Sequence, residues 1–426
     1  MALAVSGRGA VGPQEGESLA LAPMPNATDA AAEDGAQLAA TLARNAVDSL
    51  PTGALAEKLA LARGEGRALR VKLGIDPTAP DIHLGHAVVL RKLREFQDAG
   101  HQVVLIVGDY TARVGDPSGR SSLRPMLSTD EIAANAATFS EQAARILDPT
   151  PERLVVRHNG EWLDMPMSEL LALARTTTAA QLLERDDFAA RWSLRESISL
   201  LELLYPLLQG YDSVAVRADV ELGGTDQKFN LLLGRDIQRA YGQPPQAILT
   251  MPLLVGTDGE RKMSKSLGNH IAITDPPEEI YGKVMSVPDA VMGSYFGLLL
   301  GRAPPGDLSP RDAKRELARE IVSWLYSGAA AAEAERRFDR VFVARELPEE
   351  IEEASFHPDG GVLHLPGLMA EEFGMSRSQA RRLIDEGGVT LGDRPLAAGE
   401  HDVPADRADG QVLKVGRRRF RRLRAR

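Results

Sequence analysis

Two histidines occur at the predicted start of a helix, a position at which proteins can bind a phosphate. The sequence His83-Leu84-Gly85-His86 follows a proline-containing turn at 76–80 and begins a segment whose apolar residues recur at helical spacing. A helix N-terminus presents unsatisfied N–H groups and partial positive charge to an anion, and a glycine lets a flat base or ribose lie against the backbone. The imidazoles could donate to a phosphate as charge builds up in a transition state. Two alternatives stay open: structural hydrogen bonds only, or a zinc pair, although no third ligand candidate is apparent.

A second motif carries two of the nine lysines in the chain. Lys262-Met263-Ser264-Lys265-Ser266 follows a predicted strand and lies in the polar stretch 256–269. Two ammonium groups on a mobile loop can close on a polyphosphate and neutralise the charge that moves onto a leaving group. A solvated charged loop is the alternative interpretation.

The C-terminal end is basic, although the whole chain has a net charge of -10. Residues 361–426 carry 13 basic and 9 acidic side chains. A helix predicted at 376–384 places Arg377 and Arg381 on one face and apolar residues on another, and residues 414–426 include eight basic and no acidic residues. This arrangement suits several contacts to the phosphates of a nucleic acid. A solvated basic tail is the alternative interpretation.

The elements that would position these motifs alternate between strands and helices. The predicted strands are at 68–75, 102–107, 154–156, 219–222 and 247–254. The predicted helices are at 39–63, 84–99, 129–147, 168–187, 196–209 and 226–241. This alternation indicates an α/β fold with a doubly wound, Rossmann-like parallel sheet that is covered on both faces.

The pattern also predicts how the chain is divided. Residues 1–35 are rich in Ala, Gly and Pro, so we expect a disordered tail. The predicted domains are a Rossmann-like catalytic domain with N-terminal helices at 36–285, an α-helical domain at 286–355 and a small α+β domain at 361–426. The acidic stretch 347–361 is the predicted linker before the last of these.

Composition limits the class of protein. With 426 residues, 43% hydrophobic and 26% charged, the chain is expected to form two or three domains, and wholesale disorder is excluded. No stretch approaches 18 apolar residues, so no membrane span is predicted. The absence of cysteine excludes disulfides, thiolate metal sites and a cysteine nucleophile, and favours a cytoplasmic location. No secretory signal is predicted at the start of the sequence.

Together, the two motifs on a parallel α/β scaffold resemble those of class I aminoacyl-tRNA synthetases. Further stretches are similar to the bacterial tyrosyl-tRNA synthetase family and occur in its order from about residue 40 to the C-terminus. These stretches are GIDPTAPDIHLGH at 74–86, GDPSG at 115–119, YPLLQGYD at 205–212 and GGTDQ at 223–227. The helix predicted at 376–384, together with the strand predicted at 389–391, resembles an S4 RNA-binding domain.

The resemblance implies that the chain activates L-tyrosine with ATP to tyrosyl-adenylate and transfers the tyrosine to the 3′ end of tRNA(Tyr). It also implies a cytoplasmic homodimer without a resident metal, in which Mg²⁺ is carried by ATP. The residues implied in catalysis are Thr78, His83, His86, Lys262 and Lys265. Those implied in ATP binding are Asp76, Gly85, Gly224, Asp226 and Lys265. Those implied in tyrosine binding are Asp116, Tyr205, Gln209, Asp212 and Gln227, with Asp212 accepting from the phenol hydroxyl. Those implied in tRNA binding are Arg377, Arg381, Arg382, Lys414, Arg417 and Arg418.

Two residues depart from one well-known branch of that family. Lys72 stands where the branch has a tyrosine, and Glu221 stands where it has a glutamine. If Lys72 lies within about 4 to 6 Å of Asp212, its ammonium could hold that carboxylate ionised.

Three other classes of protein stay open. A nucleotidyltransferase also uses H-x-G-H, but it would not need both the lysine-containing loop at 262–266 and an RNA-binding C-terminal domain. A tryptophanyl-tRNA synthetase usually lacks the S4 domain and the pattern at 205–212. The intact histidines and lysines of the two motifs argue against a noncatalytic RNA-binding paralogue.

Overall fold

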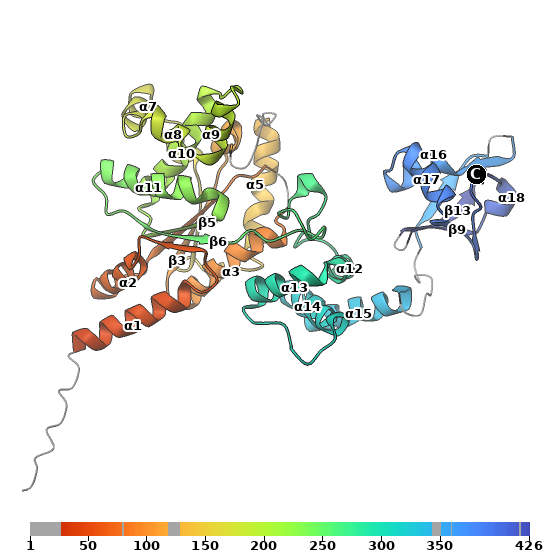
Figure 1. The fold of residues 1–426 in the computed structure, drawn as a ribbon, viewed down its shortest axis with the longest axis horizontal. Coiled ribbons are helices and arrows are strands. Elements are labelled where there is room, and N and C mark those ends of the chain that lie inside the picture. The colour runs from red at the N-terminus through yellow and green to blue at the C-terminus, as the bar shows by residue number, and fades with distance from the viewer. Residues whose placement is uncertain (1–26, 79–80, 118–127, 343–350, 359, 417–418) are drawn as a thin grey trace, which may run out of the picture. The chain divides into compact units, whose positions relative to one another are not determined.

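The computed structural model describes residues 27–78, 81–117, 128–342, 351–358, 360–416 and 419–426 (Figure 1). The chain forms two compact units. The first unit comprises Met1–Asp81 and His86–Leu253, and the second comprises Ile82–Gly85 and Leu254–Arg426. Residues 1–26, which are part of the predicted disordered tail, lie outside the described residues.

The first unit is built on a six-stranded sheet in the order β1-β6-β5-β2-β3-β4. The strands are β1 (Asp48–Leu50), β2 (Arg70–Ile75), β3 (Gln102–Val107), β4 (Leu154–His158), β5 (Val220–Gly224) and β6 (Ala247–Met251). Neighbouring strands from β6 to β4 run parallel, and β1 pairs antiparallel with β6. The predicted doubly wound parallel sheet is confirmed, and β1 is an additional edge strand.

Helices cover this sheet because its strands are apolar on both faces. Strand β3 is the run QVVLIV, of which five residues are buried, as is typical of a covered parallel sheet. Helices α10 (Leu200–Val216) and α11 (Lys228–Ala240) pack on one face, and α2 (Ala54–Gly64) lies on the opposite side (Figure 1). Helix α3 (Leu84–Asp98), between β2 and β3, buries Leu90, Leu93 and Phe96 at the predicted helical spacing. The remaining helices of this part are α1 (Ala27–Leu42), α4 (Thr111–Val114), α5 (Thr129–Ala143), α6 (Gly160–Leu163), α7 (Met167–Ala174), α8 (Ala179–Leu183) and α9 (Asp186–Ser193).

The N-terminal part of the first unit differs from the prediction. In place of one helix at 39–63, the chain forms α1, β1 and α2. The helix is interrupted because Asn45 and Gly53 have positive φ angles of 63° and 84°, which a right-handed helix excludes. Residues 27–35, predicted to be disordered, lie in α1 because their alanines have high helix propensity.

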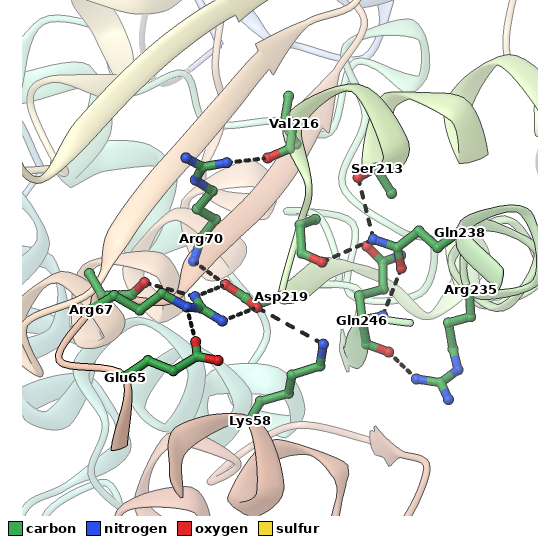
Figure 2. A network of polar contacts seen from close by, with 12 residues as sticks. Lys58, Glu65, Arg67, Arg70, Ser213, Val216, Asp219, Arg235, Gln238 and Gln246 are labelled. Carbon is green, nitrogen blue, oxygen red and sulfur yellow. Dashed lines mark hydrogen bonds and ion pairs between the residues drawn. The ribbon is translucent and has the colours of Figure 1, made fainter. Parts of the chain in front are cut away.

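A polar network holds the amino ends of β2 and β5 together (Figure 2). Asp219, just before β5, accepts from both terminal nitrogens of Arg67 (2.7 and 3.0 Å) and from the backbone N–H of Arg70 (3.0 Å). Buried Gln238 of α11 donates to the carbonyl of Ser213 in α10 and to that of Ala218 before β5, and it accepts from the backbone N–H of Gln246 (2.7 Å). These contacts fix the starts of two strands that are neighbours in the sheet.

Residues 277–342 of the second unit are mainly helical, as predicted. The helices are α12 (Pro277–Ser286), α13 (Asp289–Tyr295), α14 (Pro310–Leu325) and α15 (Gly328–Phe342), with a π-helical turn at Phe296–Leu300. Tyr281, Tyr295 and Phe296 are fully buried among them. Of the helices that the structure describes, none is both long and apolar enough to cross a membrane.

The described residues from 351 to 426 form an α+β structure, which we call the C-terminal module. Its five-stranded sheet has the order β10-β9-β12-β13-β7, and a second sheet pairs β11 with β8. The strands are β7 (Glu353–Phe356), β8 (Val362–His364), β9 (Val389–Leu391), β10 (Arg394–Pro395), β11 (Asp402–Pro404), β12 (Val412–Val415) and β13 (Arg419–Ala425). The helices are α16 (Leu365–Phe373), α17 (Arg377–Asp385) and α18 (Ala405–Ala408). The predicted helix and strand after residue 376 are confirmed as α17 and β9.

The ends of this module correct two expectations. Residues 353–356, placed in the acidic linker by the sequence, form β7, because the alternate residues Ala354 and Phe356 are buried in the module's core. Residues 419–425, for which no strand is predicted, form β13 around the buried Leu423. The linker residues 347–350 and 359 lie outside the described residues.

Candidate active site

The strand order of the first unit reverses at β2. From β2 the chain continues through β3 and β4 on one side, whereas β5 and β6 lie on the other. In open α/β sheets, ligands bind beyond the carboxyl ends of the strands at such a switch point. Asp76 directly follows β2, Gly224 ends β5, and Asp226 comes two residues later. These three residues implied in ATP binding therefore lie at the edge of the sheet where a ligand is expected.

Both carboxylate oxygens of Asp76 accept from hydroxyl groups. Tyr205 of α10 donates to Oδ2 (2.9 Å), and Thr111 of α4 donates to Oδ1 (2.7 Å). A Cβ atom at Gly108 would lie 2.1 Å from Oδ1, so this close approach requires glycine. Burial and the nearby carboxylates of Asp76 and Asp116 raise the pKa of Tyr205 well above its usual value. Tyr205 is therefore a hydroxyl donor at neutral pH.

Three more residues implied in tyrosine binding are joined by one amide that the sequence analysis missed. Buried Asn230 of α11 donates through Nδ2 to Gln209 Oε1 (2.8 Å) and to Gln227 Oε1 (3.0 Å). Gln227 in turn donates through Nε2 to Asp116 Oδ2 (2.8 Å). The Oδ1 atom of Asn230 accepts from Arg185 (3.2 Å), which fixes the orientation of its amide. The chain of bonds thus determines which end of each glutamine is the acceptor.

Asp212 of α10 is buried, with 3% of its surface exposed. Its Oδ1 accepts from the indole Nε1 of Trp162 (2.8 Å). Burial raises the pKa of Asp212 to about 6, with a further contribution from the charge of Glu221. The charge of Lys72 and hydrogen bonds from Trp162 and Asn159 act in the opposite direction. The carboxylate is therefore mainly ionised at pH 7 and mainly protonated below pH 6.

Lys72 and Glu221 form a buried ion pair between neighbouring strands. They are register partners on β2 and β5, and Lys72 Nζ lies 2.8 Å from Glu221 Oε1. Lys72 also donates to Ser213 Oγ (2.8 Å) and to the carbonyl of Gln209 (3.0 Å). Glu221 Oε2 accepts from Ser213 Oγ (3.1 Å) and from Gln246 Nε2. The effect of Lys72 on the pKa of Asp212 has the hypothesised direction, but Glu221 partly offsets it.

The last residue of the histidine motif belongs to the first unit. Burial lowers the pKa of His86 to about 4, although the charge of Asp226 opposes the shift, so the imidazole is neutral at pH 7. A Cβ atom at Gly224 would lie 2.6 Å from Asp226 Oδ1, so any larger residue would displace this carboxylate. Thr78 donates its backbone N–H to the carbonyl of Asp76 (2.8 Å).

The other residues of the motif belong to the second unit. The backbone N–H of Leu84 donates to the carbonyl of Ile271 (2.9 Å), and that of Gly85 donates to His83 Nδ1 (3.1 Å). Because Nδ1 accepts, the proton of the neutral imidazole is on Nε2. A Cβ atom at Gly85 would lie 2.9 Å from this ring. The motif is thus held against the segment that follows the lysine loop.

The lysine loop, residues 262–266, is anchored by a second amide that the sequence analysis missed. Asn269 has 3% of its surface exposed. It accepts from the backbone N–H of Ser264 (2.8 Å) and donates to the carbonyl of Lys262 (3.1 Å) and to Asp258 Oδ2 (3.0 Å). The side chains of Lys262 and Lys265 are exposed. The loop therefore has a fixed base and two exposed ammonium groups.

The basic residues of the C-terminal module are mostly exposed. Those on α17 are Arg377, Arg381 and Arg382. Arg382 lies 3.7 Å from Glu386, and Lys414 Nζ lies 5.6 Å from the centre of the Phe420 ring. Arg417 and Arg418 lie outside the described residues.

Several residues that hold these sites together were not expected from the sequence. They are Thr111, Asn159, Trp162, Asn230 and Asn269. The available signal was weak: Asn159 directly follows β4, at the edge where a parallel sheet binds ligands. Among the described residues, no three His, Asp or Glu side chains are arranged to hold a metal ion.

A comparison with known proteins identifies the family. The family described as tRNA synthetases class I (W and Y) matches residues 64–343. The chain belongs to this family. Among the relatives of this class I synthetase, the tyrosine–tRNA ligase of Moorella thermoacetica is 48% identical over 395 residues, which are 90% of this chain and 94% of that protein. The tyrosine–tRNA ligase of Thermotoga maritima is 47% identical over 394 residues, covering 90% and 96% of the two chains.

Solved structures agree with this assignment at the level of the fold. A C-terminally truncated mitochondrial tyrosyl-tRNA synthetase of Aspergillus nidulans has a TM-score of 0.59 at 22% identity, covering 73% of this chain and 99% of that one. The tyrosyl-tRNA synthetase of Archaeoglobus fulgidus, complexed with L-tyrosine, has a TM-score of 0.56 at 23% identity, covering 71% and 99%. The resemblance that the motifs suggested is confirmed.

Proposed function

We propose that this class I synthetase is a tyrosine–tRNA ligase, which activates tyrosine with ATP and transfers it to tRNA(Tyr). The observation that carries the proposal is a buried carboxylate, Asp212, on the same helix as groups that suit the two charged ends of an amino acid. The relatives that are 47–48% identical over nine tenths of the chain are named tyrosine–tRNA ligases, which supports the same substrate.

The amino and carboxylate groups of tyrosine would meet the bonded cluster around Asn230. Asp116 is an acceptor for the ammonium group. Because Asn230 occupies Gln209 Oε1, the Nε2 end of Gln209 is the donor that a substrate carboxylate would meet. Gln227, oriented by Asn230 and Asp116, and the hydroxyl of Tyr205 would complete the contacts.

The phenol hydroxyl would donate to Asp212. A pocket that only fits a ring cannot strongly reject phenylalanine, whereas a buried acceptor left unpaired by phenylalanine can, a rule for which tyrosyl-tRNA synthetases are themselves the usual illustration. Trp162 donates to Oδ1 of Asp212 and so helps to orient the carboxylate that the phenol hydroxyl would meet. Selectivity for tyrosine would therefore depend on Asp212 being ionised and oriented.

Adenylate formation needs positioning and charge stabilisation rather than a general base, because the tyrosine carboxylate is already a nucleophile. This carboxylate would attack the α-phosphorus of ATP while the bond to pyrophosphate breaks. Gly85, His86, Gly224 and Asp226 would bind the nucleoside, since the glycines keep the backbone open and neutral His86 carries no competing charge.

The charge that moves onto pyrophosphate would be stabilised by donors and cations. Thr78 and the Nε2–H of His83 would donate to the phosphate chain, and Lys262 and Lys265 would bind the leaving pyrophosphate. Mg²⁺ would arrive with ATP and keep most of its waters.

Transfer to tRNA would use the C-terminal module as an S4-like RNA-binding domain. Arg377, Arg381 and Arg382 project from one helix, and Lys414 lies on a neighbouring part of the same module. Phosphate contacts of this kind make binding depend on salt.

We also infer that the enzyme is a cytoplasmic homodimer. Large apolar side chains of the first unit are exposed on α7, on and directly after α9, and at the start of α10: Met167, Leu171, Trp192, Leu194 and Leu200. Leu200 is 81% exposed, which is unusual for leucine, and a second copy of the chain could cover this group. Sedimentation velocity should give a dimer that Leu200→Asp weakens; a monomeric unaltered chain would contradict the inference.

The function is tested by ATP–pyrophosphate exchange with each of the twenty amino acids. We expect exchange with tyrosine, and aminoacylation of tRNA(Tyr) in a second assay. Exchange with tryptophan but not tyrosine would assign the chain to the other substrate of its family. No exchange with any amino acid would favour a noncatalytic role.

A further inference from the structure

The buried Lys72–Glu221 pair lies next to the residues that are proposed to bind tyrosine. The two residues lie opposite each other on β2 and β5, the strands between which the strand order reverses. Their side chains meet α10 at Gln209 and Ser213, which lie on either side of Asp212 in the sequence. The pair therefore links the switch point of the sheet to the helix segment that carries the tyrosine-binding groups.

The hydrogen bonds of the pair leave little freedom to either side chain. The ammonium of Lys72 has three protons, and its three acceptors are Glu221 Oε1, Ser213 Oγ and the Gln209 carbonyl. Glu221 Oε2 accepts from Ser213 and from Gln246. Gln246 is itself held through its backbone by Gln238, which also binds the carbonyl of Ser213 (Figure 2). The carboxylate is thus fixed by groups on three elements.

The charges that face Asp212 come from several elements. Lys72 on β2 and Glu221 on β5 carry full charges of opposite sign, while Trp162 of α6 and the nearby Asn159 provide neutral donors. Tyr205, on the same helix as Asp212, is an uncharged hydroxyl. Removing Lys72 or Glu221 would therefore change the potential at Asp212 in opposite directions.

We propose that Lys72 and Glu221 are a positioning pair that sets the pH below which the enzyme no longer distinguishes tyrosine from phenylalanine. Glu221 weakens the hold of Lys72 on the Asp212 carboxylate, and the remaining attraction keeps this carboxylate available for the phenol hydroxyl. The inference rests on the proposed role of Asp212 in tyrosine recognition. It assigns a role to Glu221, whose charge acts on the Asp212 carboxylate rather than on the substrate.

The consequence is a pH dependence of selectivity with a predictable sign. Since burial raises the pKa of Asp212 to about 6, selectivity should fall as the pH decreases through this value. Glu221→Gln removes a negative charge that raises the pKa of Asp212, and it should move this midpoint to lower pH. Lys72→Met/Glu221→Gln removes both charges, of which Lys72 has the larger effect, and should move the midpoint to higher pH.

The experiment measures the ratio of kcat/KM for tyrosine to that for phenylalanine in pyrophosphate exchange, from pH 5 to 8. The titration of ATP affects the reactions of both amino acids equally, so it cancels in this ratio. The double variant leaves no unpaired buried charge, so it remains informative if Glu221→Gln does not fold. A matched control is Glu202→Gln, which removes another buried, ion-paired glutamate of the first unit and should leave the midpoint unchanged.

The outcomes separate this inference from the proposed function. Opposite shifts in the two variants support the pair as the element that sets the midpoint. Losses of activity with an unmoved midpoint in both variants mean that the pair only supports the fold, and overturn the inference. A chain that does not exchange tyrosine at any pH would instead overturn the proposed function itself.

Discussion

Replacing Asp212 with asparagine should stabilise the folded chain at neutral pH while weakening its recognition of tyrosine. Asp212 is buried, and its pKa is raised from 3.8 to about 6 because burial disfavours the charged form. The folded chain therefore binds this proton more tightly than the unfolded chain does. An acid with a raised pKa reduces the stability of the fold as the pH rises, which is opposite to the effect of a salt-bridged carboxylate.

The size of this effect on the free energy of unfolding follows from the pKa shift of Asp212. A difference of about two pKa units corresponds to about 3 kcal/mol between the two protonation states. This destabilisation is absent below the unfolded pKa, develops between about pH 4 and pH 6, and is complete above pH 6. The asparagine side chain of the variant does not titrate. Any hydrogen bonds that its amide gains or loses would change the free energy of unfolding by an amount that does not depend on pH. The difference in free energy of unfolding between Asp212→Asn and the unaltered chain should therefore increase by about 2 kcal/mol from pH 4.5 to pH 7.

Urea unfolding of both chains at a series of pH values measures this difference. A matched control is Asp236→Asn on the exposed surface of α11, where solvent screening should leave a much smaller pH dependence. In pyrophosphate exchange, Asp212→Asn should lose much more kcat/KM for tyrosine than for phenylalanine. A stability difference that stays flat from pH 4.5 to pH 7 would refute the reasoning, since it would mean that Asp212 does not titrate in this range.

Three further changes test the rest of the site. Lys265→Ala should slow single-turnover adenylate formation by about 100-fold or more while tyrosine affinity changes little, because the ammonium acts only as pyrophosphate charge develops; an unchanged rate would contradict this role. Asn230→Ala should raise the KM for tyrosine about tenfold, because Gln209 and Gln227 lose their common donor, and an unchanged KM would mean that their orientation is set elsewhere. A chain that ends at Phe342, the last residue of α15, should form adenylate but charge tRNA poorly and with a shallower dependence on salt; full aminoacylation at physiological salt would exclude the C-terminal module from the mechanism.

The strands and helices that carry the site were largely predictable because they have strong periodic patterns. The run at 102–107 is β3 with the predicted bounds, and the helix that begins at Leu84 follows its apolar spacing. The residues implied in tyrosine binding are connected through Asn230 or lie on α10, and their role stays a prediction. Local patterns of this kind depend on a few neighbouring residues and can therefore be read from one sequence.

Other features depend on contacts between distant residues. Asn230 of α11 joins Gln209 of α10 to Gln227, which directly precedes α11, and its own neighbours in the sequence give no sign of this. Lys72 and Glu221 have opposite effects on the pKa of Asp212. They lie side by side because of the strand register, although they are far apart in the sequence. Strand β7 was missed because it has only four residues, three of which are acidic or small, and because its pairing with β13 and the burial of Ala354 and Phe356 in the module's core involve residues far along the chain.

That last pairing has a consequence for synthesis of the chain on the ribosome. Within the described residues, β13 is the strand that pairs with β7, and it lies between β7 and β12. A ribosome adds roughly 5–20 residues per second, so several seconds pass between the synthesis of β7 and that of residues 419–425. During this interval β7 lacks the strand with which it pairs, whereas the parallel sheet of the first unit is already fully synthesised. The C-terminal module therefore completes its sheet late, and a slowdown in translation before residue 419 would prolong the exposure of this apolar strand.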